Sequence, residues 1–407
     1  MSYYINMNLT AIDSKNAGLK NEKLVLNILR RQEPLSQAQL CQKTELGSST
    51  VTYIVGRLRK KGLIQETQVE SVKRGARPKL ISINPSGGFV VGAEISPSHI
   101  LLALYDLNSS LRDKVNLSLE LDRSAENVVK LAEISIKGLL NKYEISSNML
   151  GGIGLALSGS ISPEGVVKLS GPLGWKNIPL KAMLEDYFEC PIYVFTTKVR
   201  LLAELNASPS LTKKNIVYFN AADGVGVNTI VDGNLINGAT NRCGEIGHIV
   251  IDPNGPLCGC GQRGCLEAHI SGPAIADKVK KDLASGVQSG FSKIIIEDDQ
   301  PEVVAGKWKK LIEEGDEYAL SLRDYAAEKI SWAAAAAINI FDPDVLILAG
   351  YINEVSFDYF KHHLLSRFET NVYDESSRNI EIRLAQAGHN ALMKGASAAV
   401  LEEQFSI

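Results

Sequence analysis

The sequence has no long apolar run, no evident secretory signal at residues 1–6 and no charge excess of the kind found in disordered chains. Its 407 residues are 45% hydrophobic and 22% charged with only 14 prolines, which argues against disorder and allows two or three domains. A helix that crosses a bilayer needs about 20 apolar residues, and the apolar stretch at residues 331–341 is too short. Residues 1–6 have neither the basic flank nor the apolar core of a secretory signal. We therefore expect a cytoplasmic protein with no membrane partner.

Charge is distributed unevenly along the chain. Residues 1–83 contain 14 Lys/Arg against 6 Asp/Glu, whereas the remaining residues contain 29 basic and 40 acidic side chains. A small basic head on a large acidic body indicates that the head meets a polyanion. A basic surface without any partner would give the same composition.

Three short helices are expected in the basic head. Apolar residues recur at helical spacing over residues 21–32, and a second helix is expected over residues 37–43, with Ser36 as its N-cap. A glycine turn then precedes a third helix, for which Ser48 or Ser49 is the expected cap. A short helix, a glycine-containing turn and a second helix are the plan of a helix-turn-helix.

The third helix and a basic loop after it carry the side chains expected to contact DNA. Hydroxyls near the helix start can reach base edges or phosphates, and a guanidinium can neutralise a phosphate or read guanine. Strands near residues 63–64 and 80–83 would flank the loop as a wing, and arginines in such a loop suit an A·T-rich minor groove. The expected DNA-contacting residues are Ser48, Ser49, Thr50, Thr52, Tyr53, Arg57, Lys73, Arg74, Arg77 and Lys79. A three-helix protein-interaction module is the alternative.

Strands and helices alternate after a short hinge expected at residues 84–88, which indicates an α/β body. The expected strands and helices of its first half lie at residues 89–95, 101–105, 114–121, 125–142, 151–157, 192–195 and 199–206. The second half opens with a strand over 216–220 and a glycine turn over 223–228. That turn could wrap a phosphate with backbone N–H groups or serve only the geometry of a hairpin.

The cysteines point to a metal site. Three of the six cysteines lie within eight residues, and one histidine precedes them by ten. Thiolate and imidazole ligands separated by glycine turns match a closed tetrahedral Zn²⁺ site, and four protein ligands indicate a structural rather than a catalytic zinc. The expected ligands are His248, Cys258, Cys260 and Cys265, with Cys243 as a competitor whose spacing fits less well.

The segments Glu245-x-Gly247-His248 and Cys258-x-Cys260-Gly-x-x-Gly-Cys265-x-Glu267 resemble the signature of the ROK family of repressors, open reading frames and sugar kinases. With the helix-turn-helix and wing, the whole chain resembles its repressor branch, which includes xylose and N-acetylglucosamine repressors. The resemblance implies a winged helix-turn-helix head followed by a two-lobed, actin-like and ribonuclease-H-like sugar-kinase fold. The implied domains are a head at 1–83, a first lobe at 84–206 completed by a C-terminal helix at about 385–407, and a second lobe with the zinc site at 207–384.

The same resemblance implies a sugar site in the cleft between the lobes. By position in the motifs, Glu245, His248 and Glu267 would contact sugar hydroxyls. The chemistry agrees, because carboxylates accept hydrogen bonds from vicinal hydroxyls and His248 can offer one ring nitrogen to zinc and the other to sugar. For each glutamate, a place on the surface or beside the zinc ligands is the alternative. A further sugar-binding Asn of the family is replaced by Pro172 and is not carried over.

The kinase machinery of the family is not matched. The first phosphate loop of the kinases reads Asp-x-Gly-Gly-Thr, and residues 94–98 stand at its place in this chain. Pro97 within them has no backbone N–H, so one hydrogen-bond donor is missing. Their second loop carries a glycine where Asn228 stands, and a Gly-Gly-Gly segment on the adenosine side is here Ala-Gly-Tyr351. Their general-base Asp has no counterpart within residues 196–200, and losing such a base costs roughly 10²–10⁴-fold in rate.

Lys198 lies near the missing base. Drift after the loss of catalysis is the simplest explanation; recognition of an anionic effector, such as a sugar phosphate, is the other. We therefore expect no enzyme but a sugar-responsive transcriptional regulator, most simply a repressor, that binds an operator in double-stranded DNA as a homodimer or higher oligomer. The alternatives are an ATP-dependent sugar kinase with a DNA-binding head and a DNA-binding protein whose sugar cleft has decayed.

Overall fold

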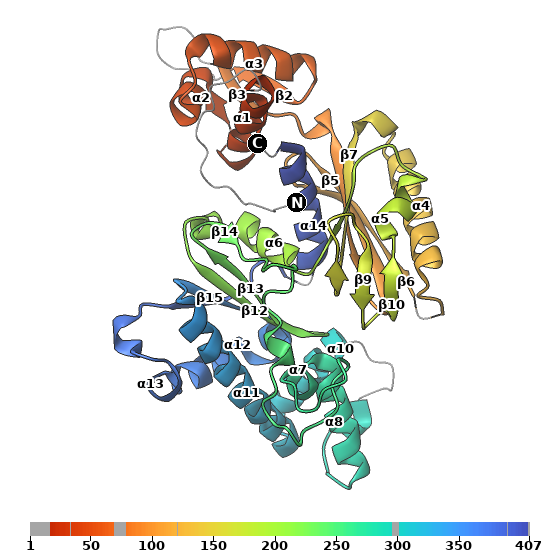
Figure 1. Ribbon diagram of the computed structural model, residues 1–407, viewed down its shortest axis with the longest axis vertical. Coiled ribbons are helices and arrows are strands. Elements are labelled where there is room, and N and C mark those ends of the chain that lie inside the picture. Colours follow the sequence, from red (N-terminus) through yellow and green to blue (C-terminus); the bar gives the residue numbers. More distant parts are fainter. Residues whose placement is uncertain are drawn as a thin grey trace. The chain divides into compact units, whose positions relative to one another are not determined.

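A computed structural model describes residues 17–32, 34–68, 79–119, 121–294, 301–388 and 390–405 (Figure 1). By its internal packing the chain divides into two compact units. The first unit contains the head, the following α/β lobe through Ala207 and the segment from Asn390 onward. The second unit is Ser208–His389. Each unit has its own five-stranded sheet and hydrophobic core, and the first unit has two smaller sheets besides.

The head is a winged helix-turn-helix, as predicted. Its elements are α1 (Ala17–Gln32), β1 (Leu35–Ser36), α2 (Gln37–Thr44), α3 (Ser48–Lys60), β2 (Ile64–Gln68) and β3 (Lys79–Ile83). Ser36 caps α2 in a capping box with Gln39, as its hydroxyl predicts. The expected serine cap of α3 is wrong: the helix begins at Ser48, and Gly47 is the N-cap without any side-chain bond. The aliphatic side chains of all three helices form a buried core.

The wing strands β2 and β3 pair antiparallel, with Ile64 opposite Ile83. The tip between them, residues 69–78, lies outside the described residues, and with it Lys73, Arg74 and Arg77. The expected short hinge at residues 84–88 contains a 3₁₀ helix, Pro85–Gly87. The Asn84 amide donates to the Gly62 carbonyl at 2.7 Å, so this connection is held against the end of α3.

The first lobe is a five-stranded sheet with the order β11-β7-β4-β5-β6. Strands β4 to β6 form an antiparallel meander, whereas β7 and β11 run parallel to β4. The third meander strand begins and ends about three residues earlier than predicted. The elements are β4 (Phe89–Ile95), β5 (His99–Asp106), β6 (Leu111–Ser118), α4 (Ala125–Lys142), β7 (Leu150–Leu157), β8 (Ser160–Ile161), β9 (Val167–Ser170), β10 (Trp175–Ile178), α5 (Leu180–Glu185), β11 (Ile192–Phe195) and α6 (Val199–Ala207).

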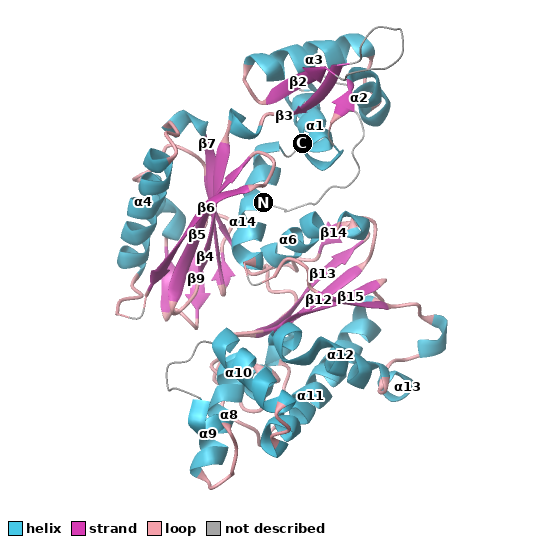
Figure 2. Ribbon diagram, turned by 180° about the vertical axis from the view of Figure 1, so that it is seen from behind, coloured by secondary structure: helices cyan, strands magenta, loops and turns pink. Residues whose placement is uncertain are grey.

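The second lobe repeats this topology with the order β14-β13-β12-β15-β16. Again three strands form an antiparallel meander and two run parallel to the first. Figure 2 shows helices gathered on one side of this sheet. The elements are β12 (Ile216–Ala221), β13 (Val225–Val231), β14 (Asn234–Leu235), α7 (Glu267–Ile270), α8 (Gly272–Ala284), α9 (Phe291–Ile294), α10 (Pro301–Glu313), α11 (Glu317–Phe341), β15 (Val345–Gly350), α12 (Tyr351–Leu365), α13 (Phe368–Asn371) and β16 (Glu381–Leu384). Two lobes with one topology confirm the predicted sugar-kinase-like fold.

Helix α11 contains the alanine-rich apolar stretch of the sequence. All of its alanines except the partly buried Ala336 are buried, because α11 packs against α10, α12 and the sheet of the second lobe. Across the described ranges, no helix combines the length and apolar character that a membrane span requires.

The last helix, α14 (Ala391–Phe405), completes the first unit. It packs on α6, β4 and β7, where glycines let it approach closely. A β-carbon at Gly92 would lie 2.3 Å from the Met393 carbonyl oxygen, and one at Gly154 would lie 2.7 Å from that of Ala396. Near its other end Glu402 pairs with Arg30 of α1 at 3.2 Å. Helix α14 therefore contacts both the first lobe and the head.

Candidate functional site

The four predicted metal ligands come together in the second unit. The ligand atoms of His248, Cys258, Cys260 and Cys265 all lie within 4.8 Å of one another. Cys260 Sγ is 3.7 Å from Cys265 Sγ, and Cys258 Sγ is 3.7 Å from His248 Nδ1. Tetrahedral bonds of about 2.3 Å to sulfur and 2.0–2.1 Å to nitrogen separate the ligand atoms by roughly 3.6–3.8 Å. The cluster could therefore hold a tetrahedral metal ion.

Tight turns bring the ligands together. Cys258 N–H donates to the Gln262 carbonyl at 2.7 Å, and Gly261 N–H donates to that of Cys258 at 2.9 Å. Gly264 has a φ of +70°, and a β-carbon there would lie 1.5 Å from the Asp252 carbonyl oxygen, so only glycine fits. The competing ligand Cys243 is outside the cluster.

The thiols of the cluster have different environments. Burial raises the pKa of Cys265 to about 12 and also raises the pKa of Cys258. By contrast, the backbone N–H of Gln262 lowers the pKa of Cys260. Burial disfavours a thiolate unless a cation compensates its charge. Three thiols and an imidazole in this geometry fit a soft or borderline metal ion, which would supply that charge.

The predicted sugar-binding residues of this unit gather around the first residue of β13. A β-carbon at Gly247 would lie 2.2 Å from the Val225 carbonyl oxygen, so the glycine lets the 3₁₀ turn Ile246–His248 pack directly on this strand. The Val225 N–H in turn donates to Glu267 Oε2 at 2.9 Å. His248 Nε2 lies 3.9 Å from Glu245 Oε2, on the ring edge away from the thiols. The structure thus brings Glu245, His248 and Glu267 together.

The glycine hairpin differs from its prediction. The turn is shorter than the expected 223–228, because β13 already begins at Val225 and the following residues pair with β12. Asn228, for example, lies opposite Tyr218 in the ladder. Backbone N–H groups used in a sheet cannot wrap a phosphate, and Val225 N–H is used by Glu267.

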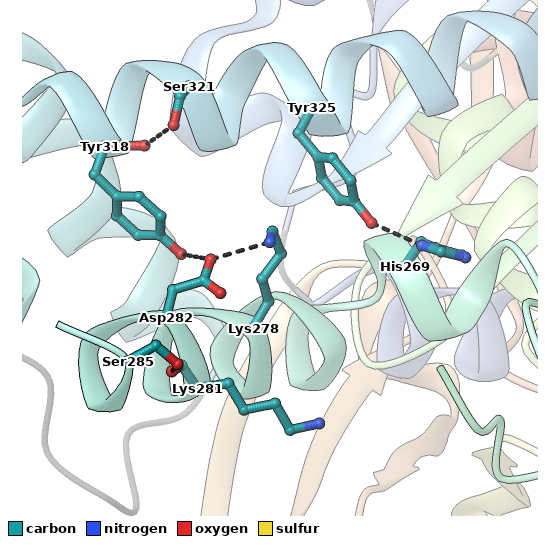
Figure 3. Close-up of polar contacts among 8 residues, drawn as sticks. All are labelled: His269, Lys278, Lys281, Asp282, Ser285, Tyr318, Ser321 and Tyr325. Carbon is teal, nitrogen blue, oxygen red and sulfur yellow. Dashed lines mark hydrogen bonds and ion pairs between the residues drawn. The ribbon is translucent and has the colours of Figure 1, made fainter. Parts of the chain in front are cut away.

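Helix α7 carries Glu267 and is fixed by residues that sequence reasoning missed. His269, two residues further on, is buried, and its Nδ1 lies 2.7 Å from the Tyr325 hydroxyl of α11 (Figure 3). Burial, with Lys329 and Lys278 nearby, lowers the pKa of His269. The Tyr351 hydroxyl donates to the Ile270 carbonyl at 2.8 Å. These contacts join residues 56 and 81 positions apart, so no local pattern predicts them.

Two segments stand where the resemblance to the kinases predicts nucleotide loops. In both, side chains of this chain contact one another. In the turn between β4 and β5, the Ser96 and Ser98 hydroxyls lie 2.8 and 3.0 Å from His99 Nδ1. Tyr351 is buried, with its ring centroid 5.8 Å from that of Trp308. A bulky aromatic residue thus occupies a position where the resemblance to kinases predicts glycine.

Lys198 belongs to the first unit and is buried, at 8% exposure. It precedes α6, within a turn in which Val199 N–H donates to the Thr196 carbonyl at 3.4 Å. The described residues of this turn, 196–200, carry no carboxylate.

Helix α3 presents the predicted hydroxyls on its surface. Ser48, Ser49, Thr50, Thr52 and Tyr53 are exposed, as is Lys79 of the wing. The Thr52 hydroxyl already donates to the Ser48 carbonyl at 2.8 Å.

Sequence reasoning missed Lys60 on the same face of α3. Residues 49, 53, 56 and 60 follow helical spacing on the side opposite the buried stripe, so Lys60 lies in line with Ser49 and Tyr53. A β-carbon at Gly56, between them, would meet no atom of the described residues within 4 Å, which leaves open space for a close approach.

A winged helix-turn-helix joined to two lobes of one topology, with a His-Cys₃ cluster in the second, defines a protein of the sugar-kinase-like fold with a DNA-binding head. The family model described as the ROK family matches residues 90–403, and the chain belongs to this family. A model described as the MarR family matches residues 20–75, within the head.

Similar proteins cover nearly the whole chain. The xylose repressor of Caldicellulosiruptor bescii is 25% identical over 390 residues, which are 95% of this chain and 96% of the repressor. The DNA-binding transcriptional dual regulator NagC of Escherichia coli K12 is 25% identical over 82% of this chain and 81% of NagC. A crystal structure of a ROK family transcriptional regulator, described as a homolog of the E. coli MLC protein, has a TM-score of 0.78 at 22% identity and covers 95% of this chain and 96% of its own.

Proposed function

We propose that the protein is a sugar-responsive transcriptional repressor that acts in the cytoplasm on carbohydrate genes. The observation that carries the proposal is the combination, in one chain, of an exposed hydroxyl-bearing α3 with the Glu245–His248–Glu267 group. Repressors similar to this chain along 95% of its length support it. The head would bind an operator, and a sugar held by the second unit would change that binding.

The sugar would be held by hydrogen bonds to the group around Val225. Glu245 is exposed and His248 partly exposed, so their polar atoms are open to a ligand. Glu267 uses one oxygen for the Val225 N–H and keeps a second for a hydroxyl. The metal is proposed to be a structural zinc ion, held by His248, Cys258, Cys260 and Cys265, that fixes the His248 ring at Nδ1 and leaves Nε2 to face the sugar.

Sugar phosphorylation is not proposed. The turn at Ser96 is closed by His99, and Tyr351 fills the position of an expected glycine. The turn around Lys198 offers no carboxylate as a general base. These substitutions support a regulator over a kinase with a DNA-binding head.

We further infer that the repressor binds DNA as a homodimer or a higher oligomer. One α3 helix per chain covers one half-site, and two-fold related heads would read a palindromic operator. The effector is a sugar or a sugar phosphate. Relatives named for xylose and for N-acetylglucosamine repression leave several sugars as candidates.

The proposal is tested with the full-length protein. Binding-site selection from genomic fragments provides an operator, and fluorescence anisotropy then measures its affinity with each member of a panel of sugars and sugar phosphates. We expect one compound to weaken operator binding at least tenfold. A coupled assay of ADP release over the same panel should stay at background. Sugar-dependent ADP release would support the kinase alternative, and operator binding that no compound changes would support a decayed sugar site.

A further inference from the structure

A buried carboxylate in the head contacts the recognition helix. Glu22 of α1 is only 2% exposed, and Leu24, Val25 and Leu26, which follow it in the same helix, are buried as well. Lys61, at the end of α3, donates to Glu22 Oε2 at 2.7 Å, and Arg57 Nε lies 2.8 Å from Oε1. The arginine contact is a close ion pair without the alignment of a hydrogen bond. One acidic side chain thus holds two cations that are one helical turn apart.

Burial makes this arrangement costly unless it has partners. A carboxylate removed from water is strongly destabilising by itself, and paired cations compensate it only in good geometry. Here both cations keep contact with solvent, because the side chains of Arg57 and Lys61 are 42% and 44% exposed. Both side chains therefore contact Glu22 and still stay partly open to solvent, where a phosphate or a base could reach them.

The contact also fixes how α3 is turned. Arg57 and Lys61 lie on one flank of α3, between the buried stripe and the outward residues Tyr53 and Lys60. Because Glu22 of α1 contacts both side chains, it restricts rotation of α3 about its axis. The Arg57 guanidinium also lies 5.8 Å from the centre of the exposed Tyr53 ring. This cation–π contact further restricts the orientation of the guanidinium.

We propose that Glu22 is a positioning residue for DNA recognition: it orders Arg57 and Lys61 before DNA binds and cancels one of their two charges. An ordered guanidinium favours a geometry-specific contact to a base or phosphate, whereas a free one binds any phosphate. Glu22 should therefore raise discrimination between operator and other DNA while lowering affinity for DNA of random sequence. This inference rests on the proposed DNA-binding function and assigns a role within it.

The head offers a matched control. Glu66 of β2 also bridges two cations, with Arg59 at 3.2 Å and Lys79 at 3.0 Å, but it lies in the wing and contacts neither Arg57 nor Lys61. Glu66→Gln removes the same charge from the head as Glu22→Gln. A difference between the two variants then reflects the position of the lost carboxylate, because the change in net charge is the same in both.

The experiment compares full-length wild type, Glu22→Gln and Glu66→Gln on two duplexes of equal length. One is a fragment selected from genomic DNA by the wild type, and the other has a random sequence. For Glu22→Gln we expect the ratio of operator to random-sequence affinity to fall about tenfold. We also expect the salt dependence of random-sequence binding to steepen by about one unit of logarithmic slope, because one more cation is free to bind phosphate. Glu66→Gln frees a cation as well, the expected DNA contact Lys79, so its slope should steepen too, but its ratio of operator to random-sequence affinity should stay that of the wild type because Arg57 and Lys61 remain ordered.

A double-mutant cycle separates positioning from stability. If Glu22 acts through Arg57, adding Glu22→Gln to Arg57→Ala should change the ratio much less than it does in the wild type. A purely structural role of Glu22 would lower the melting temperature and leave the ratio and the slope unchanged, and this result would overturn the proposal. An equal fall of the ratio in both glutamine variants would also overturn it. If Glu22→Gln does not fold, Glu22→Asp keeps the charge and shortens the reach; the proposal then expects an unchanged slope with a lower ratio, and an unchanged ratio overturns it. Failure of the wild type to select any fragment would instead refute the DNA-binding function itself.

Discussion

Val225 and Glu267 are joined by a 2.9 Å hydrogen bond from the backbone N–H of the first to Oε2 of the second. The bond joins the start of β13 to the start of α7, 42 positions later in the chain. It orients a carboxylate before any ligand arrives, and an oriented acceptor loses less entropy on binding. A residue predicted for sugar binding is therefore also part of the scaffold.

Replacing Glu267 by Gln should weaken effector binding more than it weakens the fold. The amide oxygen can still accept the Val225 N–H, but the charge that strengthens a bond to a sugar hydroxyl is lost. We expect a loss of about 1.5–3 kcal/mol in binding, roughly ten- to a hundredfold, with a melting temperature close to that of the wild type. Calorimetry with the compound that releases the wild type from its operator measures it. Glu314→Gln, at an exposed ion pair, is the control, and equal affinities of the wild type and Glu267→Gln would exclude Glu267 from the sugar site.

Removing one thiol should remove the metal. Cys265→Ser breaks the tetrahedral set, so we expect about one zinc per chain in the wild type and almost none in the variant, together with a lower melting temperature. Elemental analysis of the purified proteins measures the content. Cys243→Ser, outside the cluster, should keep the metal. A folded, sugar-responsive wild type without metal would contradict a structural role.

The N-cap of α11 should make the second unit sensitive to acid. Burial alone would raise the pKa of Asp316, but hydrogen bonds from Gly290 N–H, Ala319 N–H and the Ser289 hydroxyl outweigh it and lower this pKa. The stabilisation is complete above the unfolded-state pKa, near 4, and is lost as the pH falls through the folded-state value.

Asp316→Asn should therefore lower the free energy of unfolding at pH 7 by about 1–3 kcal/mol. The difference from wild type should shrink as the pH falls below about 4. Urea unfolding over a pH series measures both, with the exposed Asp277→Asn as the control. A difference that stays constant into acid would show that the charge of Asp316 is not what stabilises the cap.

Lys198 distinguishes two classes of effector. If its charge recognises an anion, a sugar phosphate should bind the wild type roughly ten- to a hundredfold more tightly than the neutral sugar, and Lys198→Ala should lose that preference. If the residue reflects drift, neutral sugar should bind as well as its phosphate, and the variant should match the wild type. Calorimetry with paired sugars on both proteins decides between these outcomes.

Local chemistry made several features of the fold predictable. The capping hydroxyl of Ser36 and the apolar periodicity of α4 and β11 gave their positions closely, and the spacing of one histidine and three cysteines gave the cluster. The errors arose where the local structure is determined by hydrogen bonds to other segments of the chain. The connection after β3 is held by Asn84, which donates to Gly62, 22 residues earlier, and the glycine hairpin is shorter than expected because residues of its expected loop pair with β12.

Other site features had no signal in the sequence at all. Nothing near Glu22 indicates that it meets Arg57 and Lys61, since α1 and α3 meet only in the folded head. The same holds for His269 and Tyr325, which come from different helices. Charge pattern predicts that a surface meets DNA or sugar, but the contacts that hold its side chains in place depend on tertiary packing.

The place of α14 in the chain has a consequence for synthesis. The first lobe cannot cover the glycine-lined face of β4 and β7 until α14 has left the ribosome, after the whole of Ser208–His389. At about 5–20 residues per second, those residues take roughly 10–40 s to translate. During that interval the head has all its own residues, while the lobe behind it presents an uncovered sheet. Nascent chains at this stage should be natural clients of chaperones that bind exposed apolar surfaces.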